Sequence, residues 1–181
     1  IDFHALQTFP PSLINRDDTG APKTAIFGGV PRQRVSSQSC KRAIRKDFEK
    51  KFPTYLRGYR TRRAIELLAN SIQELDTSIE EVEATALSQK VFKAAGFKTV
   101  KRKTTKKGAK AAEQKNDLEY PICLSVRQVK NLAKYAVNHR EEEKFTKKAL
   151  KPLFAEDPSV DIAMFGRMVA EAKDFNVDAS V

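Results

Sequence analysis

The stretch from Arg32 to Phe52, RQRVSSQSCKRAIRKDFEKKF, carries the strongest structural signal in the chain. Apolar residues recur in it at four-residue spacing, which predicts a helix with one apolar face. Ser36 or Ser37 can cap this helix, because a short hydroxyl side chain accepts a hydrogen bond from an unpaired first-turn N–H. The apolar positions are Cys40, Ala43, Ile44 and Phe48.

A second face of the predicted helix is cationic. From Pro31 to Lys46 the sequence has six Lys or Arg residues and no acid. A helix N-terminus offers unpaired N–H groups and partial positive charge, and this mixture of donors suits a row of phosphates. The alternative is a basic helix whose charged face is only solvated. The candidate anion-binding residues are Ser36, Ser37, Gln38, Lys41, Arg42 and Arg45.

Composition narrows the class of partner. The 181 residues are 40% hydrophobic, enough for one sizeable domain, and the net charge is +11. Such a charge favours a polyanionic partner, most simply nucleic acid. An anionic membrane is the alternative, but no apolar run approaches the ~20 residues of a spanning helix.

Cysteine usage indicates a reducing, cytosolic setting. Cys40 and Cys123 are far apart and have no neighbouring cysteine, so we expect free thiols. With His4 and His139 they make no usual zinc-site spacing. We expect no metal and no other cofactor.

The order of the elements predicts an α+β fold with a helical insertion. Alternating apolar residues predict strands at Ile1–Phe9 and Ser159–Phe165, and two strands are too few for a stable sheet. We therefore expect the rest of the sheet to lie outside this chain, which begins at Ile1 without a Met. The expected helices between the strands are Tyr55–Leu75, a helix from about Glu80 to Ala95, a Ser125-capped helix to Asn138, and Glu141–Leu150.

One internal segment has a different composition. Residues 98–115 carry eight Lys or Arg, one acid and no large apolar residue except Val100. Because such a segment cannot bury a core, we expect a mobile basic loop over about 98–117. A second, weaker basic patch lies at the start of the first inserted helix, with Arg57, Arg60, Arg62 and Arg63.

Two short motifs leave alternatives open. Asp17-Asp18 could hold a metal or supply a general base, but Asp-Asp-Thr-Gly is also common turn chemistry. Gly28-Gly29 lets the backbone turn. Arg167 could bind phosphate and Met168 could wedge against a base; the local pattern favours a surface Arg167 and a core Met168.

Two of these motifs resemble a known family. The run NRDD…K…AIFGG…R.R.SSQS.KRAIR, Asn15 to Arg45, resembles the N-terminal signature of the backbone subunit of the type I-E CRISPR Cascade complex, the CasC or Cse4 family. The run VDIAMFGRM, Val160 to Met168, resembles its second signature. The resemblance implies an incomplete ferredoxin-like, RNA-recognition-motif type palm with a helical fingers insertion. The implied parts are palm at 1–54, fingers at 55–157 and palm again at 158–181, leading towards a thumb that relatives carry further on.

The resemblance also implies a non-catalytic function. Copies of such a subunit polymerise along the CRISPR RNA, grip its phosphate backbone and present its bases to the target DNA strand. Their other partners are the small, large and guide-end-binding Cascade subunits. Two other functions stay open, a metal-dependent ribonuclease using Asp17 or Asp18 and a generic basic nucleic-acid-binding module. The implied RNA-binding residues are Arg16, Lys23, Ser36, Ser37, Gln38, Lys41, Arg42, Arg45, Arg167 and Met168.

Overall fold

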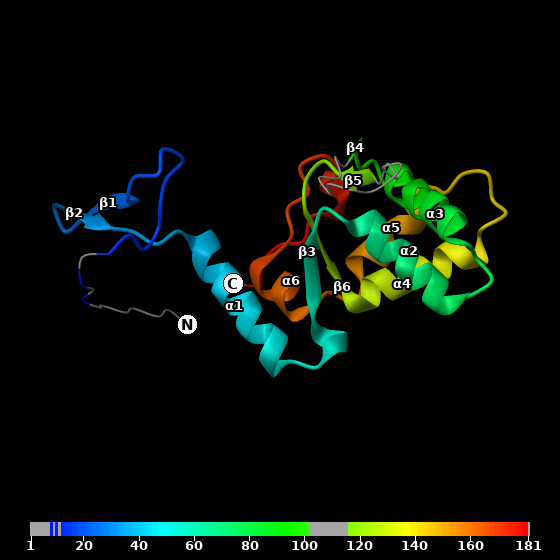
Figure 1. The fold of residues 1–181 in the computed structure, drawn as a ribbon, viewed down its shortest axis with the longest axis horizontal. Helices are drawn as coiled ribbons and strands as arrows, with labels where there is room; N and C mark the ends of the chain where they lie inside the picture. The colour runs from blue at the N-terminus through cyan, green and yellow to red at the C-terminus, as the bar shows by residue number, and fades with distance from the viewer. Residues whose placement is uncertain (1–7, 9, 11, 102–115, 181) are drawn as a thin grey trace, which may run out of the picture. The chain divides into compact units, whose positions relative to one another are not determined.

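The chain folds into two compact units. The computed structural model describes residues 8, 10, 12–101 and 116–180. A smaller unit comprises residues 1–50 and a larger unit residues 51–181, coloured from blue to cyan and from cyan to red in Figure 1. Helices combine with small antiparallel sheets, which confirms the predicted α+β class. The proposed division into palm and fingers stays a prediction, and the first expected strand lies almost entirely outside the described residues.

The smaller unit consists of a hairpin followed by a long helix. Strands β1, Thr24–Phe27, and β2, Val30–Gln33, pair antiparallel with Phe27 opposite Val30. The two-residue turn between them is Gly28-Gly29, and both residues have positive φ, 64° and 78°. Tight hairpin turns of this length need that conformation, which glycine adopts without steric cost. Helix α1, Ser37–Lys51, confirms the predicted helix, but none of its residues is buried.

The larger unit holds the other elements of the described chain. They are η1 Thr54–Leu56, β3 Gly58–Thr61, α2 Ala64–Leu75, α3 Glu81–Ala94, β4 Thr99–Lys101, β5 Asn116–Leu118, β6 Ile122–Ser125, α4 Val126–Asn138, α5 Lys147–Ala155, α6 Val160–Phe165 and η2 Lys173–Phe175. Strand β3 pairs antiparallel with β6, and β4 pairs antiparallel with β5. Among the described residues, no helix is long and apolar enough to cross a membrane.

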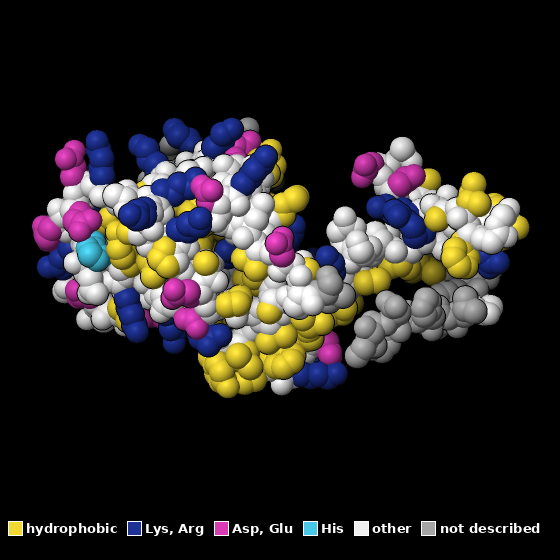
Figure 2. Space-filling view, turned by 180° about the vertical axis from the view of Figure 1, so that it is seen from behind, with side chains coloured by type: hydrophobic (Ala, Val, Ile, Leu, Met, Phe, Trp, Pro, Cys, Tyr) yellow, Lys and Arg dark blue, Asp and Glu magenta, His cyan; other side chains and the backbone are white. Residues whose placement is uncertain are grey.

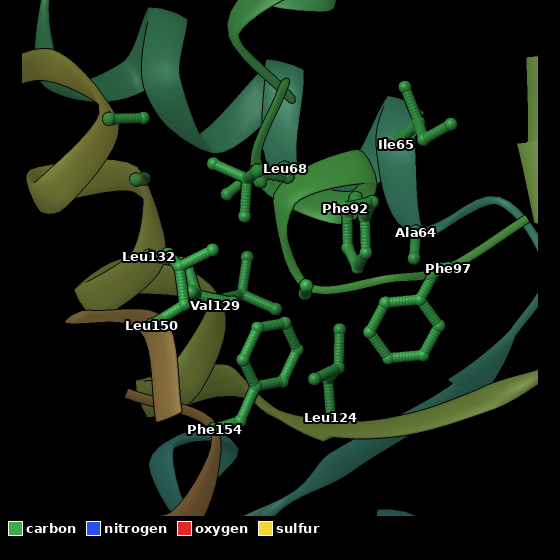
Figure 3. Close-up of a cluster of buried hydrophobic side chains, with 14 of the residues drawn as sticks. Ala64, Ile65, Leu68, Phe92, Phe97, Leu124, Val129, Leu132, Leu150 and Phe154 are labelled. Atoms are coloured by element: carbon green, nitrogen blue, oxygen red, sulfur yellow. The ribbon is translucent and has the colours of Figure 1, made fainter. Parts of the chain in front are cut away.

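A single hydrophobic core holds the larger unit together. Helices α2, α3 and α4 pack on one another, and their apolar faces meet side chains from β6 and α5 (Figure 3). Phe92 and Phe154 are fully buried, with ring centroids 6.2 Å apart. Burying one such side chain contributes roughly 1.5–3 kcal/mol, so this core forms a rigid base for the segments at its surface.

Two of the predicted inserted helices are confirmed, and two are correct only over part of their length. Helices α3 and α4 match the expected segments, and Ser125 caps α4 as predicted. The segment from Tyr55 to Leu75 is not one helix, because β3 pairs with β6 before α2 begins. The expected helix at Glu141–Leu150 instead begins at Lys147 behind the cap residue Thr146 and continues through Pro152.

The expected loop over 98–117 also needs correction. Its two ends form β4 and β5, which pair with Thr99 opposite Leu118. Leu118 is 1% exposed, so this ladder is anchored in the core. Residues 102–115 between the strands lie outside the described part of the chain.

The expected strand at Ser159–Phe165 is wrong, because this segment is helix α6. The Ala163 N–H donates to the Ser159 carbonyl at 2.9 Å, and the Gly166 N–H donates to the Ile162 carbonyl at 2.9 Å. Gly166 then ends the helix at φ 69° and ψ 177°, a backbone conformation that is essentially restricted to glycine. Alternation over six residues does not distinguish a strand from two helical turns.

Ser125 should contribute more stability than Thr146, the side-chain N-cap of α5. Ser125 Oγ accepts from the Gln128 N–H at 2.9 Å and donates to the Asp157 carbonyl at 2.6 Å, and Gln128 Oε1 accepts from the Ser125 N–H. We expect Ser125→Ala to lower the free energy of unfolding by about 1–2 kcal/mol in urea titrations. Thr146→Ala is the matched control, because its cap bond is long, 3.3 Å, and exposed. A larger loss in Thr146→Ala would contradict this ranking.

Candidate nucleic-acid interface

Asn15 ties three parts of the smaller unit together. Its Oδ1 accepts a hydrogen bond from the Ser36 N–H at 2.9 Å, and its carbonyl accepts from the Lys23 N–H at 2.8 Å. The Lys23 carbonyl in turn accepts from the Arg34 N–H at 2.9 Å. The loop, the hairpin and the start of α1 therefore share one hydrogen-bonded frame. This role of Asn15 has no local sequence pattern, because the contact spans 21 residues.

Ser36 is the residue that caps α1. Its carbonyl accepts from the Cys40 N–H at 3.3 Å, and its Oγ accepts from the Ser39 N–H at 3.4 Å. Ser36 is buried, whereas Ser37 and Gln38 are exposed at the first helical positions. The prediction of a serine cap is thus confirmed, with Ser36 as the cap and Ser37 as the first residue of the helix.

The cationic residues of α1 share one side of the helix. At 3.6 residues per turn, positions 38, 41, 42 and 45 fall within roughly 100° of one another. Arg42 is exposed, and Lys41 and Arg45 are half-buried. Positions 40, 43 and 44 fall on the opposite side. Figure 2 shows Lys and Arg side chains of the smaller unit among exposed hydrophobic ones, with Asp and Glu side chains on the same face.

Arg16 and Lys23 join this frame through the backbone. Arg16 forms an isolated antiparallel bridge with Pro22, and Lys23 is bonded to Asn15. The Arg16 side chain is exposed and that of Lys23 is half-buried. The structure therefore brings both residues into the hydrogen-bonded frame that starts α1, as an anion site built from this loop requires.

Asp17 organises the turn of the same loop. Its Oδ1 accepts from the Thr19 N–H at 2.9 Å, the Thr19 Oγ at 2.7 Å and the Ala21 N–H at 3.0 Å. These bonds lower the pKa of the Asp17 carboxyl below its usual value, the Thr19 hydroxyl being the largest cause. The turn interpretation of the acid pair is confirmed. Among the described residues no three His, Cys, Asp or Glu side chains form a potential metal site.

Arg167 is not a surface charge, as the local pattern had favoured, but a buried one. Its side chain is 4% exposed, and its Nε donates to the Phe175 carbonyl at 2.9 Å. Its terminal nitrogens donate to the carbonyls of Cys123 and Phe154 at 3.2 and 2.7 Å, and to Gln128 Oε1 at 3.4 Å. Burial lowers the pKa of Arg167 to about 10, so the guanidinium stays charged at neutral pH. A contact of Arg167 with RNA stays a prediction, and the structure commits this side chain to internal acceptors.

Met168, in contrast to Arg167, is exposed to solvent. The local pattern favoured a core position, but its side chain is 85% exposed. The backbone on both sides is fixed: Arg167 and Val177 exchange two hydrogen bonds of 2.8 and 2.9 Å, and the Val169 N–H donates to Asn176 Oδ1 at 2.7 Å. A flexible thioether is thus presented to solvent from a rigid support.

Comparisons with known proteins place the chain in context. Residues 1–181 match the family described as CT1975-like protein. Two solved chains resemble the structure, one titled "CRISPR RNA-guided surveillance complex" (30% identity, TM-score 0.70) and one titled "CRISPR RNA-guided surveillance complex, pre-nicking" (31%, 0.67). The matches cover 96% and 93% of this chain but 54% and 46% of the solved ones, so the chain spans about half their length. No curated protein matches.

Arg167 should be far more important for stability than an exposed arginine. We expect Arg167→Lys to lower the free energy of unfolding by about 2–4 kcal/mol, because a lysine cannot supply donors to all four buried acceptors. Arg140→Lys is the control, since its ion pairs with Asp76 and Glu141 are exposed and contribute little. Equal denaturation midpoints for the two variants would contradict the buried role of Arg167.

The Asp17 turn predicts a specific dependence on pH. Because the folded-state pKa is lowered, the turn is stabilised at pH values above the ordinary value of 3.8 and loses this contribution as the pH falls through the lowered value. An NMR titration of the Asp17 carboxyl should therefore give a midpoint below 3.8. Thr19→Ala removes the principal donor and should raise the midpoint, and an unchanged midpoint in this variant would contradict the assigned cause.

Proposed function

Because the chain belongs to the CT1975-like protein family, we propose that it is a CRISPR RNA-binding backbone subunit of a type I-E Cascade surveillance complex. The titles of the solved chains that it resembles, which name CRISPR RNA-guided surveillance complexes, support this proposal. Because the chain spans about half of their length, the proposal concerns the complete protein to which it corresponds.

The observation that carries the proposal is the frame around the start of α1. It combines the N-terminus of a serine-capped helix, exposed Ser37 and Gln38, and a helix side with Lys41, Arg42 and Arg45. These groups recognise phosphate oxygens and not base edges, so they would hold a guide without reading its sequence. Arg16 and Lys23 supply further charge from the adjoining loop.

Gripping the backbone leaves the bases free, and this determines the rest of the proposed function. Sequence is then recognised by pairing between the guide and the target DNA strand. Met168 would contact a base, since its exposed thioether is apolar and adaptable. The buried Arg167, the preceding residue, would hold the backbone of Met168 in position. Copies of the subunit would line up along one guide, together with the small, large and guide-end-binding subunits.

We propose that the subunit is not catalytic. Asp17 is already occupied by three donors from its own turn, so it is poorly suited to hold a metal or to accept a proton from RNA. The ribonuclease function would need at least one more ligand near Asp18. A scaffold function needs only the hydrogen-bond donors and cations described above.

The test is RNA binding by the complete protein as a function of salt. Neutralising two phosphate contacts in Arg42→Gln/Arg45→Gln should reduce the slope of log K against log salt by about 1.4, since each contact on a single strand contributes about 0.7. The measurement is fluorescence anisotropy with CRISPR RNA, together with the ratio of RNA to protein after purification.

The matched control is Lys46→Gln/Lys50→Gln, which removes the same charge from the same helix. Both lysines are exposed and follow the cationic positions. The control should lose little affinity and retain its salt slope. If both variants lost the same slope, net charge and not the α1 site would explain RNA binding. An unchanged slope in the arginine variant would refute the proposed grip.

A further inference from the structure

A second cationic surface lies on the larger unit, where β3 leads into α2. Arg60, Arg62 and Arg63 are all exposed there. Within the described part of the chain none of the three takes part in an ion pair. The proposed grip on the guide phosphates uses α1 and the loop before it, and it leaves these arginines without a function.

Arg62 is held in a fixed orientation. Its Nε donates to the Leu118 carbonyl at 3.1 Å, and the Leu118 N–H donates back to the Arg62 carbonyl at 2.8 Å. Leu118 is 1% exposed, so the arginine is anchored to the core. The Nε bond leaves the terminal nitrogens of the guanidinium for an outside acceptor. A pre-oriented guanidinium fork suits the two oxygens of a phosphate.

An exposed aromatic ring accompanies the arginines. Tyr120 is 58% exposed and lies in the bend between β5 and β6. Before the bend, Leu118 is hydrogen-bonded to Arg62, and after it, Ile122 pairs with Thr61. The short bend that carries Tyr120 is therefore connected on both sides to the segment from Arg60 to Arg63, which carries the arginines.

The surroundings keep this surface positive. Strand β4 pairs with β5 beside the bend (Figure 1). Lys98, just before β4, and Lys101, at its end, are both exposed. The acids on the same segments are Glu66, Asp117 and Glu119, and a fourth acid, Glu171, accepts a hydrogen bond from the Lys98 N–H at 3.1 Å. Five cations therefore stand against four acids.

We propose that Arg60, Arg62, Arg63 and Tyr120 form a binding site for a second, single-stranded polynucleotide, separate from the strand held by α1. Arginines for phosphates and an aromatic ring for base stacking are the combination that single-strand binding uses. An acidic protein would need the charges but not the exposed ring, and a duplex would not offer its base faces to that ring. This inference rests on the proposed function in one respect, that the guide occupies the smaller unit.

The test uses the complete protein loaded with its guide RNA. The probe is fluorescein-labelled oligo(dT) of 20 nucleotides, which cannot pair with a mixed-sequence guide, and the readout is anisotropy over a salt series. We expect Arg60→Gln/Arg62→Gln/Arg63→Gln to weaken oligo(dT) binding at least tenfold and to reduce the salt slope by about 2. We expect Tyr120→Ala to weaken it at least fivefold without changing the slope, and Tyr120→Phe to bind normally.

Controls separate this site from bulk charge and from the guide site. Lys93→Gln/Lys130→Gln/Lys134→Gln removes the same charge from exposed positions on α3 and α4 and should bind oligo(dT) normally. Arg60→Gln/Arg63→Gln leaves the Arg62–Leu118 bond intact and should still weaken binding if the triple variant misfolds. Guide content after purification should be unchanged in all of these variants, whereas failure of the proposed guide site would appear as normal guide content in Arg42→Gln/Arg45→Gln.

Three results would overturn the inference. One is equal loss of oligo(dT) binding in the lysine control, which would indicate charge alone. Another is loss of guide RNA in the arginine variants, which would assign these residues to the first strand. The third is normal oligo(dT) binding combined with loss of another protein subunit from the complex, which would identify a protein interface.

Discussion

The packing of β6, α4, α5 and η2 on one another depends on one buried cation, Arg167. A guanidinium removed from water must replace its lost hydration with internal acceptors, or the larger unit loses several kcal/mol of stability. Four segments supply them to Arg167: the carbonyls of β6, α5 and η2, and the side chain of Gln128 on α4. Gln128 also donates to two carbonyls near the end of α5 and completes the cap of α4. The cation therefore holds these four segments next to one another. Because Met168 follows Arg167 directly, its side chain is held at the surface.

The smaller unit is stabilised in a different way. None of the α1 residues is buried, and the strands of its hairpin are exposed along their whole length. Its shape comes from local hydrogen bonds, chiefly those of Asn15, Asp17 and Ser36, and from a glycine turn. Such bonds orient backbone N–H groups and cations without a core. This arrangement suits a surface that binds a polyanion, because the binding groups stay in contact with water until the ligand arrives.

Both proposed polynucleotide-binding sites use cations whose positions are set by hydrogen bonds of the protein backbone. At α1 the helix itself spaces the charges, and Asn15 connects the helix start to the loop that carries Arg16 and Lys23. At β3 the reciprocal bonds between Arg62 and Leu118 fix an arginine against the core. Long, flexible side chains lose conformational entropy on binding. A side chain that is already partly ordered in the free protein loses less, and this favours association.

The sequence by itself determined those features that depend on neighbours along the chain. Four-residue apolar spacing predicted α1, serine chemistry predicted the caps of α1 and α4, and Gly28-Gly29 predicted a turn, because each is fixed within a few residues. Tertiary structure decided the rest. Pairing of β3 with β6 replaced the first half of an expected helix, and α6 took the place of an expected strand. Arg167 and Met168 exchanged their expected positions, because burial of a charge requires acceptors from four distant segments, and no local pattern encodes where those segments meet.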